Sequence, residues 1–141
     1  NMNLEHKRWY TGFSMRAEVG GYVYNNVAAQ SGNLQSGNST FNSGNIHSSF
    51  LETGFEGKSF EQTINSYYLE KSDFLRMDYF TLGYNFGNQL SEKFRMNAAL
   101  VINNVFVFSN YSGMDPEVVG GIDNTIYPRP RIFSLNLTFD F

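Results

Sequence analysis

Charged side chains occupy the middle of two runs in which apolar and polar residues alternate. Arg16 and Glu18 lie in the first run, and Arg76 and Asp78 lie in the second. Successive side chains of a strand point to opposite faces, so each pair shares its face with the polar residues around it. Charged groups in such a position suit a face that water wets, where they can contact a polar solute or pair with one another. Tyr22 continues the face of Arg16 and Glu18 and adds an aromatic hydrogen-bonding group.

Residue types that catalysis or metal binding requires are scarce in this chain. It has no cysteine, and its two histidines, His6 and His47, lie in segments without a regular pattern. No Gly-x-Ser-x-Gly sequence and no glycine-rich strand-to-helix phosphate loop occurs. Asp115-Pro-Glu117 and Asp123 could suggest calcium, but they lack EF-hand spacing and are typical of turn capping. The sequence therefore predicts a protein that is not an enzyme and that needs no metal and no cofactor.

The composition favours a membrane β-structure. Aromatic residues make up 17% of the 141 residues, yet the mean hydropathy is only −0.36, as expected where each strand is half apolar and aromatic residues collect at membrane interfaces. The net charge of −3 and the pI of about 5.3 give no broad basic surface for nucleic acid. No apolar run approaches the ~20 residues of a membrane-spanning helix. The amino end has no signal-peptide hydrophobic region, so we expect a fragment of a longer precursor.

Alternation predicts four strands. The first is expected to run without interruption from Trp9 to Tyr24. In the second, the apolar face changes parity between Asp78 and Phe80, which indicates a one-residue bulge. In the third, the parity slips near Asn104. The predicted strands cover residues 9–24, 74–86, 93–108 and 131–141.

The last segment has the clearest pattern. Its apolar wall faces away from the polar Ser134, Asn136, Thr138 and Asp140. The alternation fits either an antiparallel strand on a soluble core or a barrel strand between lipid and water. An aromatic last residue in phase with the wall favours the barrel. Proline cannot donate to a ladder, so Pro128 and Pro130 should precede the strand, and Arg129 and Arg131 share the parity of the wall. The wall consists of Phe133, Leu135, Leu137, Phe139 and Phe141.

The connections alternate in length. Residues 25–73 and 109–127 form long loops, whereas residues 87–92 form a short turn. Outer-membrane barrels have long extracellular loops and short periplasmic turns. With a periplasmic carboxy terminus, both loops would be extracellular and the turn periplasmic. The first loop is rich in Asn, Ser and Gly, can hold short strands or a helical turn, and has aromatic residues expected mainly to pack it: Phe41, Phe50, Phe55, Phe60, Tyr67 and Tyr68.

Several stretches resemble SusC/RagA-like TonB-dependent outer-membrane transporters. Gly20-Gly-Tyr-Val-Tyr-Asn-Asn26 is similar to a strand-to-loop junction of the family. Phe74-Leu-Arg-Met-Asp-Tyr-Phe-Thr-Leu-Gly-Tyr-Asn-Phe86 is similar to its "SFLR…TLGY-x-F" segment. Asn103-Asn-Val-Phe106 with Tyr111-Ser-Gly-Met-Asp-Pro-Glu117 resembles its "NLF…Y-x-G-x-DPE" block, with Val105 where the family more often has Leu. Tyr127-Pro-Arg-Pro-Arg131 resembles its "YPRPR" ending.

The resemblance implies a bacterial outer-membrane barrel of about 22 strands with a plug. It implies import of oligosaccharides or peptides, energised by TonB–ExbB–ExbD, with a SusD-like surface lipoprotein as a lid. Partners would then include the remainder of the barrel and plug, outer-membrane lipid and the substrate, but no nucleic acid. Arg16, Glu18, Tyr22, Arg76 and Asp78 become candidates for substrate contact in the lumen, with pairing among themselves or against the plug as the alternative. The apolar wall from Phe133 to Phe141 resembles the signal that barrel-assembly machinery reads.

We therefore predict an all-β fold in which four antiparallel transmembrane strands form the carboxy-terminal part of such a barrel. Four strands cannot close a barrel, since about eight is the minimum. Two alternatives stay open. One is a small complete barrel of about eight strands, with further strands hidden in residues 25–73. The other is a soluble β-sandwich that binds carbohydrate through the aromatic residues of the first loop.

Overall fold

A computed structural model describes residues 1–32, 47–53, 66–88, 93–125 and 127–141. The chain divides into two compact units. We call the first the sheet unit (Asn1–Glu18, Phe74–Phe108 and Arg129–Phe141) and the second the loop unit (Val19–Asp73 and Ser109–Pro128).

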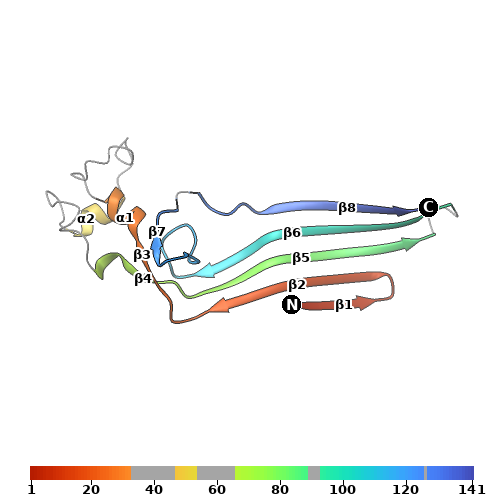
Figure 1. The fold of residues 1–141 in the computed structure, drawn as a ribbon, viewed down its shortest axis with the longest axis horizontal. Coiled ribbons are helices and arrows are strands. Elements are labelled where there is room, and N and C mark those ends of the chain that lie inside the picture. The colour runs from red at the N-terminus through yellow and green to blue at the C-terminus, as the bar shows by residue number, and fades with distance from the viewer. Residues whose placement is uncertain (33–46, 54–65, 89–92, 126) are drawn as a thin grey trace. The chain divides into compact units, whose positions relative to one another are not determined.

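The sheet unit consists of five strands that lie side by side in the order β1-β2-β5-β6-β8 (Figure 1). Every pair for which a register is defined in this sheet is antiparallel. The predicted all-β, antiparallel fold is therefore confirmed. The strands are β1 (Met2–His6), β2 (Trp9–Glu18), β5 (Phe74–Gly87), β6 (Arg95–Ser109) and β8 (Ile132–Asp140).

One strand of the sheet was not predicted. β1 pairs with β2 from Met2↔Phe13 to His6↔Trp9 through a two-residue turn. Lys7 in this turn has a φ of 58°, a left-handed conformation that few residues other than glycine adopt. β1 is short and carries only two apolar residues in alternation, so its sequence alone gave too little signal.

The first predicted strand, residues 9–24, is wrong as a single element. β2 ends at Glu18, and a separate strand, β3 (Tyr22–Asn25), belongs to the loop unit. The break lies at the Gly20-Gly21 pair, where Gly20 has a φ of 90° and its N–H donates to Asp73 Oδ1 at 2.6 Å. Glycine weakens a strand interior and adopts a positive φ without strain. The backbone therefore turns at Gly20, although the alternation of apolar and polar residues in the sequence continues past it.

The bulge predicted in the second strand is confirmed. Ser14 pairs with Tyr79, but the next residue, Met15, pairs with Met77. Asp78 is therefore the extra residue of β5, and this reverses the apolar face along the strand.

β6 and β8 pair continuously from Arg95↔Asp140 to Asn103↔Ile132. Leu135 faces Leu100 and Leu137 faces Ala98, while Asn136 faces Ala99. Pro128 and Pro130 precede β8, as predicted. The slip predicted near Asn104 coincides with a φ of 52° at that residue, a conformation that asparagine tolerates better than most side chains.

The loop unit has a three-stranded sheet of its own, ordered β4-β3-β7. β4 (Leu69–Lys71) is antiparallel to β3, and β7 (Ile122–Asp123) is parallel to it. Three short helical segments complete the described part: α1 (Asn26–Ser31), α2 (Ser49–Thr53) and the 3-10 turn η1 (Ser66–Tyr68). The prediction that the first loop holds short strands and helical turns is confirmed. Its core is small and consists of Ala28, Ala29 and Tyr68, with Tyr24 packed against them.

The turn between β1 and β2 lies at the end of the sheet where β5 ends. Trp9, next to the β1–β2 turn, pairs with Tyr84, and the Asn85 N–H donates to the Arg8 carbonyl at 2.8 Å. β5 ends nearby at Gly87, which has a φ of 56°, and β6 begins at Arg95. Residues 89–92 of the predicted short turn lie outside the described residues. The connection between β1 and β2 is thus short and precedes the long connection between β2 and β5, which continues the predicted alternation of connection lengths.

Candidate functional site

Three of the predicted site residues meet on the polar face of the sheet unit. Arg16 on β2 and Arg76 on β5 are direct cross-strand partners. Like charges in such a pair destabilise a sheet. The bulge at Asp78 places a carboxylate beside them, and Arg16 Nε donates to Asp78 Oδ2 at 2.9 Å and to Oδ1 at 3.1 Å. The bulge therefore offsets the charge repulsion between the two arginines.

Both guanidinium groups also contact one aromatic ring. The Cζ atoms of Arg16 and Arg76 lie 5.8 and 5.6 Å from the centroid of the Phe74 ring. Cations at this distance from a ring face are attracted by its quadrupole. Arg76 is only 3% exposed and Phe74 only 6%, whereas the side chains of Arg16 and Asp78 are 41% and 32% exposed. The solvent-accessible part of the cluster is thus a guanidinium and a carboxylate, which together can hydrogen-bond a polar solute.

The other two candidates lie apart from this ion pair. Glu18 is the last residue of β2, opposite Phe74, and is exposed. Tyr22 belongs to β3 of the loop unit, so its predicted place on the same strand as Arg16 is wrong. Of the pairings among the candidates that we gave as the alternative, the structure shows the ion pair between Arg16 and Asp78.

Sequence reasoning missed a contact that joins three strands on the polar face. Tyr10 on β2 is the cross-strand partner of Gly83 on β5, and its hydroxyl donates to Asn97 Oδ1 on β6 at 2.8 Å. A Cβ atom at Gly83 would lie 2.0 Å from the Tyr10 ring. The ring therefore lies directly over the glycine. An aromatic residue opposite a strand glycine was the available signal.

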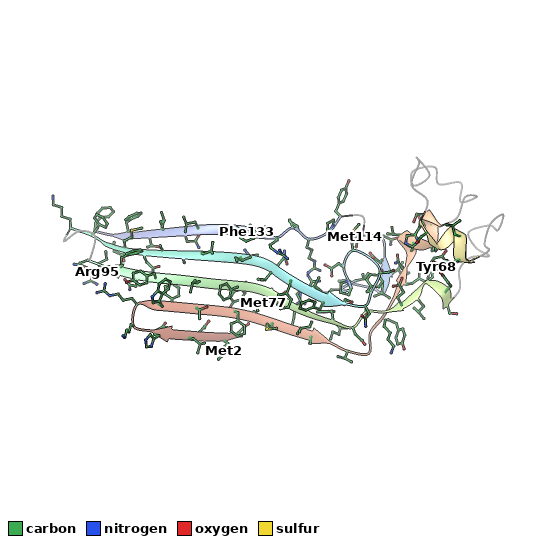
Figure 2. All side chains as sticks on the ribbon, turned by 180° about the vertical axis from the view of Figure 1, so that it is seen from behind. Met2, Tyr68, Met77, Arg95, Met114 and Phe133 are labelled. Carbon is green, nitrogen blue, oxygen red and sulfur yellow. The ribbon has the colours of Figure 1, made fainter. Side chains whose placement is uncertain are left out.

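The opposite face of β6 and β8 is apolar and open to its surroundings. Phe133 and Leu135 are 64% and 67% exposed, and Leu137 and Phe139 are about half exposed. Figure 2 labels Phe133 on β8. Aromatic rings cluster at the end of the sheet that carries the β1–β2 turn. The ring centroids of Trp9 and Tyr84 are 4.7 Å apart there, and those of Phe94 and Phe139 are 5.7 Å apart. Such a surface requires an apolar environment or a partner.

In the loop unit, buried polar side chains tie distant segments together. Asn25 is 2% exposed and caps α1 by accepting the Ala28 N–H at 3.0 Å. Its Nδ2 donates to Glu70 Oε1 at 3.0 Å and to Ser112 Oγ at 3.1 Å. Ser112 in turn donates from its N–H and its hydroxyl to Glu70 at 2.9 and 2.7 Å. One asparagine thus joins three segments of the chain.

A second buried pair, Tyr111 and Asp123, holds the segment that begins at Tyr111 and resembles the transporter family. The Tyr111 hydroxyl donates to Asp123 Oδ2 at 2.7 Å, and Asp123 is 1% exposed. Burial, followed by the hydrogen bond to Asp123, raises the pKa of Tyr111 well above its ordinary value of 10.0. Asp123 Oδ1 accepts the Thr125 N–H at 2.7 Å and Asp115 Oδ1 accepts the Glu117 N–H at 3.0 Å. These contacts confirm the turn-capping interpretation of both aspartates.

A cavity of about 170 Å³ lies beside this network, lined among others by Asn25, His47, Met114 and Asp123. The amide of Asn25 and the carboxylate of Asp123 are both engaged by protein groups, so their role is structural. Within residues 1–32, 47–53, 66–88, 93–125 and 127–141, no group of three or more histidine or acidic side chains could hold a metal ion. None of the helices described is long and apolar enough to cross a membrane.

Comparisons with known proteins point to one group. No protein-family profile matches the chain. The chain is 31% identical over 144 residues to the TonB-dependent receptor SusC of Bacteroides thetaiotaomicron, covering 98% of this chain and 14% of that protein. It is 32% identical over 87 residues to the TonB-dependent receptor P39 of Formosa agariphila, covering 54% of this chain and 8% of that receptor. The chain thus spans a small part of the curated relatives.

Solved structures show the same fold. The RagAB peptide importer in its "closed-closed" state matches with a TM-score of 0.67 at 18% identity, over 96% of this chain and 16% of that one. The "open-open" state matches with a TM-score of 0.68 at 19% identity, over the same shares.

Proposed function

We propose that this chain, a member of the SusC/RagA-like TonB-dependent transporters, forms part of the wall of an outer-membrane β-barrel that imports oligosaccharides or peptides. The observation that carries the proposal is the exposed apolar row of β8. Phe133 and Leu135 are about two-thirds exposed, and the polar Ser134 and Asn136 alternate with them. A strand placed between lipid and a water-filled lumen requires such a division.

The two alternatives explain less of the structure. A soluble sandwich would bury the apolar face of its sheet under a second sheet, but in the described residues this face is exposed. A complete eight-stranded barrel would draw strands from residues 25–73. The described parts of that segment form short helices and β4, which joins the sheet of the loop unit.

We further propose that the polar face of the sheet lines the lumen and that Arg16 and Asp78 contact the substrate there. Their exposed guanidinium and carboxylate provide donors and acceptors for a sugar hydroxyl or a peptide group. Glu18 lies near them on the same face of β2, and Arg76 supports the cluster from a buried position. Tyr22 stays a candidate on the loop unit, where its side chain is 57% exposed.

The whole transporter would work with partners that this chain does not contain. We propose a SusD-like surface lipoprotein as the lid, energy from TonB–ExbB–ExbD, and a plug within the barrel. The long connections would be extracellular and the short turns periplasmic. The names of the relatives support TonB-dependent import, since SusC and P39 are TonB-dependent receptors and RagAB is a peptide importer. None of them is named as an enzyme.

The row Phe133, Leu135, Leu137, Phe139 and Phe141 is proposed as the assembly signal of the barrel. Phe133, Leu135, Leu137 and Phe139 alternate along β8 and are exposed, and Phe141 directly follows the strand. β8 is an edge strand of the sheet. An exposed strand edge must find a partner strand before it can lie in lipid.

The test is uptake by cells that produce the full-length protein from its own gene. Deletion of the gene should abolish growth on one class of substrate, either oligosaccharides or peptides, and the protein should fractionate with the outer membrane. Recovery of the folded protein in the aqueous fraction without detergent would contradict the proposal. For the lumen site, Arg16→Gln with Asp78→Asn should raise the half-saturating substrate concentration, whereas the control Thr138→Ser should leave it unchanged.

A further inference from the structure

We propose that Arg131 and Arg129, immediately before β8, bind the phosphate of a phosphorylated glycolipid in the leaflet that surrounds the long connections. This inference rests on the proposed function, because it requires the apolar face of the sheet to lie in a membrane. The site would lie outside the barrel, and it is separate from the substrate cluster on the polar face.

The first argument is position. Arg131 lies directly before β8, two residues ahead of Phe133, the first residue of the apolar row. Arg129 precedes it by two more, and both arginines are exposed. Two exposed cations therefore precede the apolar row in the chain, and the proposed function places them where hydrocarbon gives way to head groups. Long cationic side chains at such a boundary extend toward the head groups.

The second argument is that the backbone here is held in place. The Asn104 side chain, at the left-handed residue of β6, donates to the Pro130 carbonyl at 2.9 Å. Arg131 Nε donates to the Asn104 carbonyl at 3.4 Å. This contact engages one of the five N–H donors that a guanidinium carries. Pro130 also fixes its own φ, so the segment loses little freedom when it binds a ligand.

The third argument is the asymmetry of charge along the row. At its other end the row finishes with Phe139 and Phe141, and the neighbouring charge, Asp140, lies on the opposite face across from Arg95. In the described part of β8 and its flanks, cations therefore adjoin the apolar row at one end alone. An anionic head group matches that end, and guanidinium pairs with phosphate in a bidentate geometry.

The experiment uses the full-length protein purified in a neutral detergent. Native mass spectrometry measures its binding of lipid A and of dephosphorylated lipid A, with inorganic phosphate as a separate competitor. The wild type should bind lipid A more tightly than the dephosphorylated form. Arg129→Gln with Arg131→Gln should remove most of this preference, at about fivefold per arginine. Arg95→Gln, an exposed arginine at the opposite end of the sheet, is the matched control and should keep it.

Equal binding of the two lipids by the wild type would overturn the inference, and so would an undiminished preference in the double variant. Displacement of lipid A by millimolar inorganic phosphate would also overturn it, because the site would then be a general anion site. Failure of the proposed function looks different, since the protein would then fractionate without detergent and would support no uptake. A protein that inserts and imports normally but shows no phosphate preference would refute only the lipid site.

Discussion

The two units of this chain place their polar and apolar side chains in opposite ways. In the loop unit, the most buried side chains include Asn25, Asp123 and Tyr68, and hydrogen bonds between distant segments hold the unit together. In the sheet unit, large apolar side chains such as Leu135 are exposed, and Arg76 is among the few buried residues. The difference agrees with the proposal that one face of the sheet unit lies in lipid and that the loop unit lies in water. A unit in water buries what it cannot expose, whereas a strand in lipid exposes its apolar side.

The difference between the two units is tested most directly at the apolar row of β8. Leu135→Arg should cost about 2–4 kcal/mol of folding free energy if this position lies near the middle of a bilayer. The control Asn136→Arg, on the other face of the same strand, should be close to neutral. Urea titration of the full-length protein in lipid vesicles measures both variants. Equal effects at the two positions would show that the two faces do not divide lipid from water.

The buried carboxylate of the loop unit provides the second test. Asp123→Ala removes the acceptor for the Tyr111 hydroxyl and the Thr125 N–H, and should cost about 1.5–3 kcal/mol. Hydrogen–deuterium exchange of the full-length protein should show faster exchange in the loop unit and unchanged exchange in β6 and β8. Asp73→Ala, at an exposed contact in the same unit, is the milder comparison. An increase that spreads equally over both units would show that they do not fold separately.

The polar face of the sheet is tested at Gly83. Gly83→Ala places a methyl group against the Tyr10 ring and should cost about 1–3 kcal/mol, because the ring must move and lose its bond to Asn97. Folding yield and urea midpoint in vesicles measure the effect. In a Tyr10→Ala background the same substitution should be nearly neutral. Additive effects of the two changes would mean that the ring does not lie over the glycine.

Alkaline pH should weaken the loop unit before the sheet unit. The pKa of Tyr111 is raised in the folded chain, so the unfolded chain ionises this tyrosine first as the pH rises. The stabilisation is complete below pH 10 and is lost progressively above it. Exchange rates of the loop unit should therefore rise above pH 10 after correction for intrinsic exchange, and Tyr111→Phe should reduce this dependence. If the exchange rates of the Tyr111→Phe variant rose by the same amount, the pH dependence would come from another group.

The smallest effect is expected at the exposed ion pair. Because Arg16 and Asp78 are partly exposed, Arg16→Gln should change stability by about 0–1 kcal/mol. A double-mutant cycle with Asp78→Asn in vesicles measures the coupling. A coupling above 2 kcal/mol would mean that the pair is shielded from water, and it would make a role in substrate contact less plausible.

Local patterns in the sequence determined a large part of this protein. Period-two alternation located β5, β6 and β8, because each strand has one apolar face wherever it lies in the fold. The parity change located the bulge at Asp78, and the two prolines located the start of β8. The exposed apolar row also follows from sequence alone. Phe41, Phe55 and Phe60, which were expected to pack the first loop, lie outside the described residues, whereas the buried Tyr68 confirms that role for one residue.

Only the tertiary structure decided where the first strand ends and which residues meet. Alternation runs unbroken through Gly20 and Gly21, and the turn depends on a bond to Asp73, far along the chain. Tyr10 and Asn97 are 87 residues apart, as are Asn25 and Ser112. Strand order and register create such contacts, and a local pattern contains neither. The sequence therefore determined which side chains share a face, and the fold determined which of them touch.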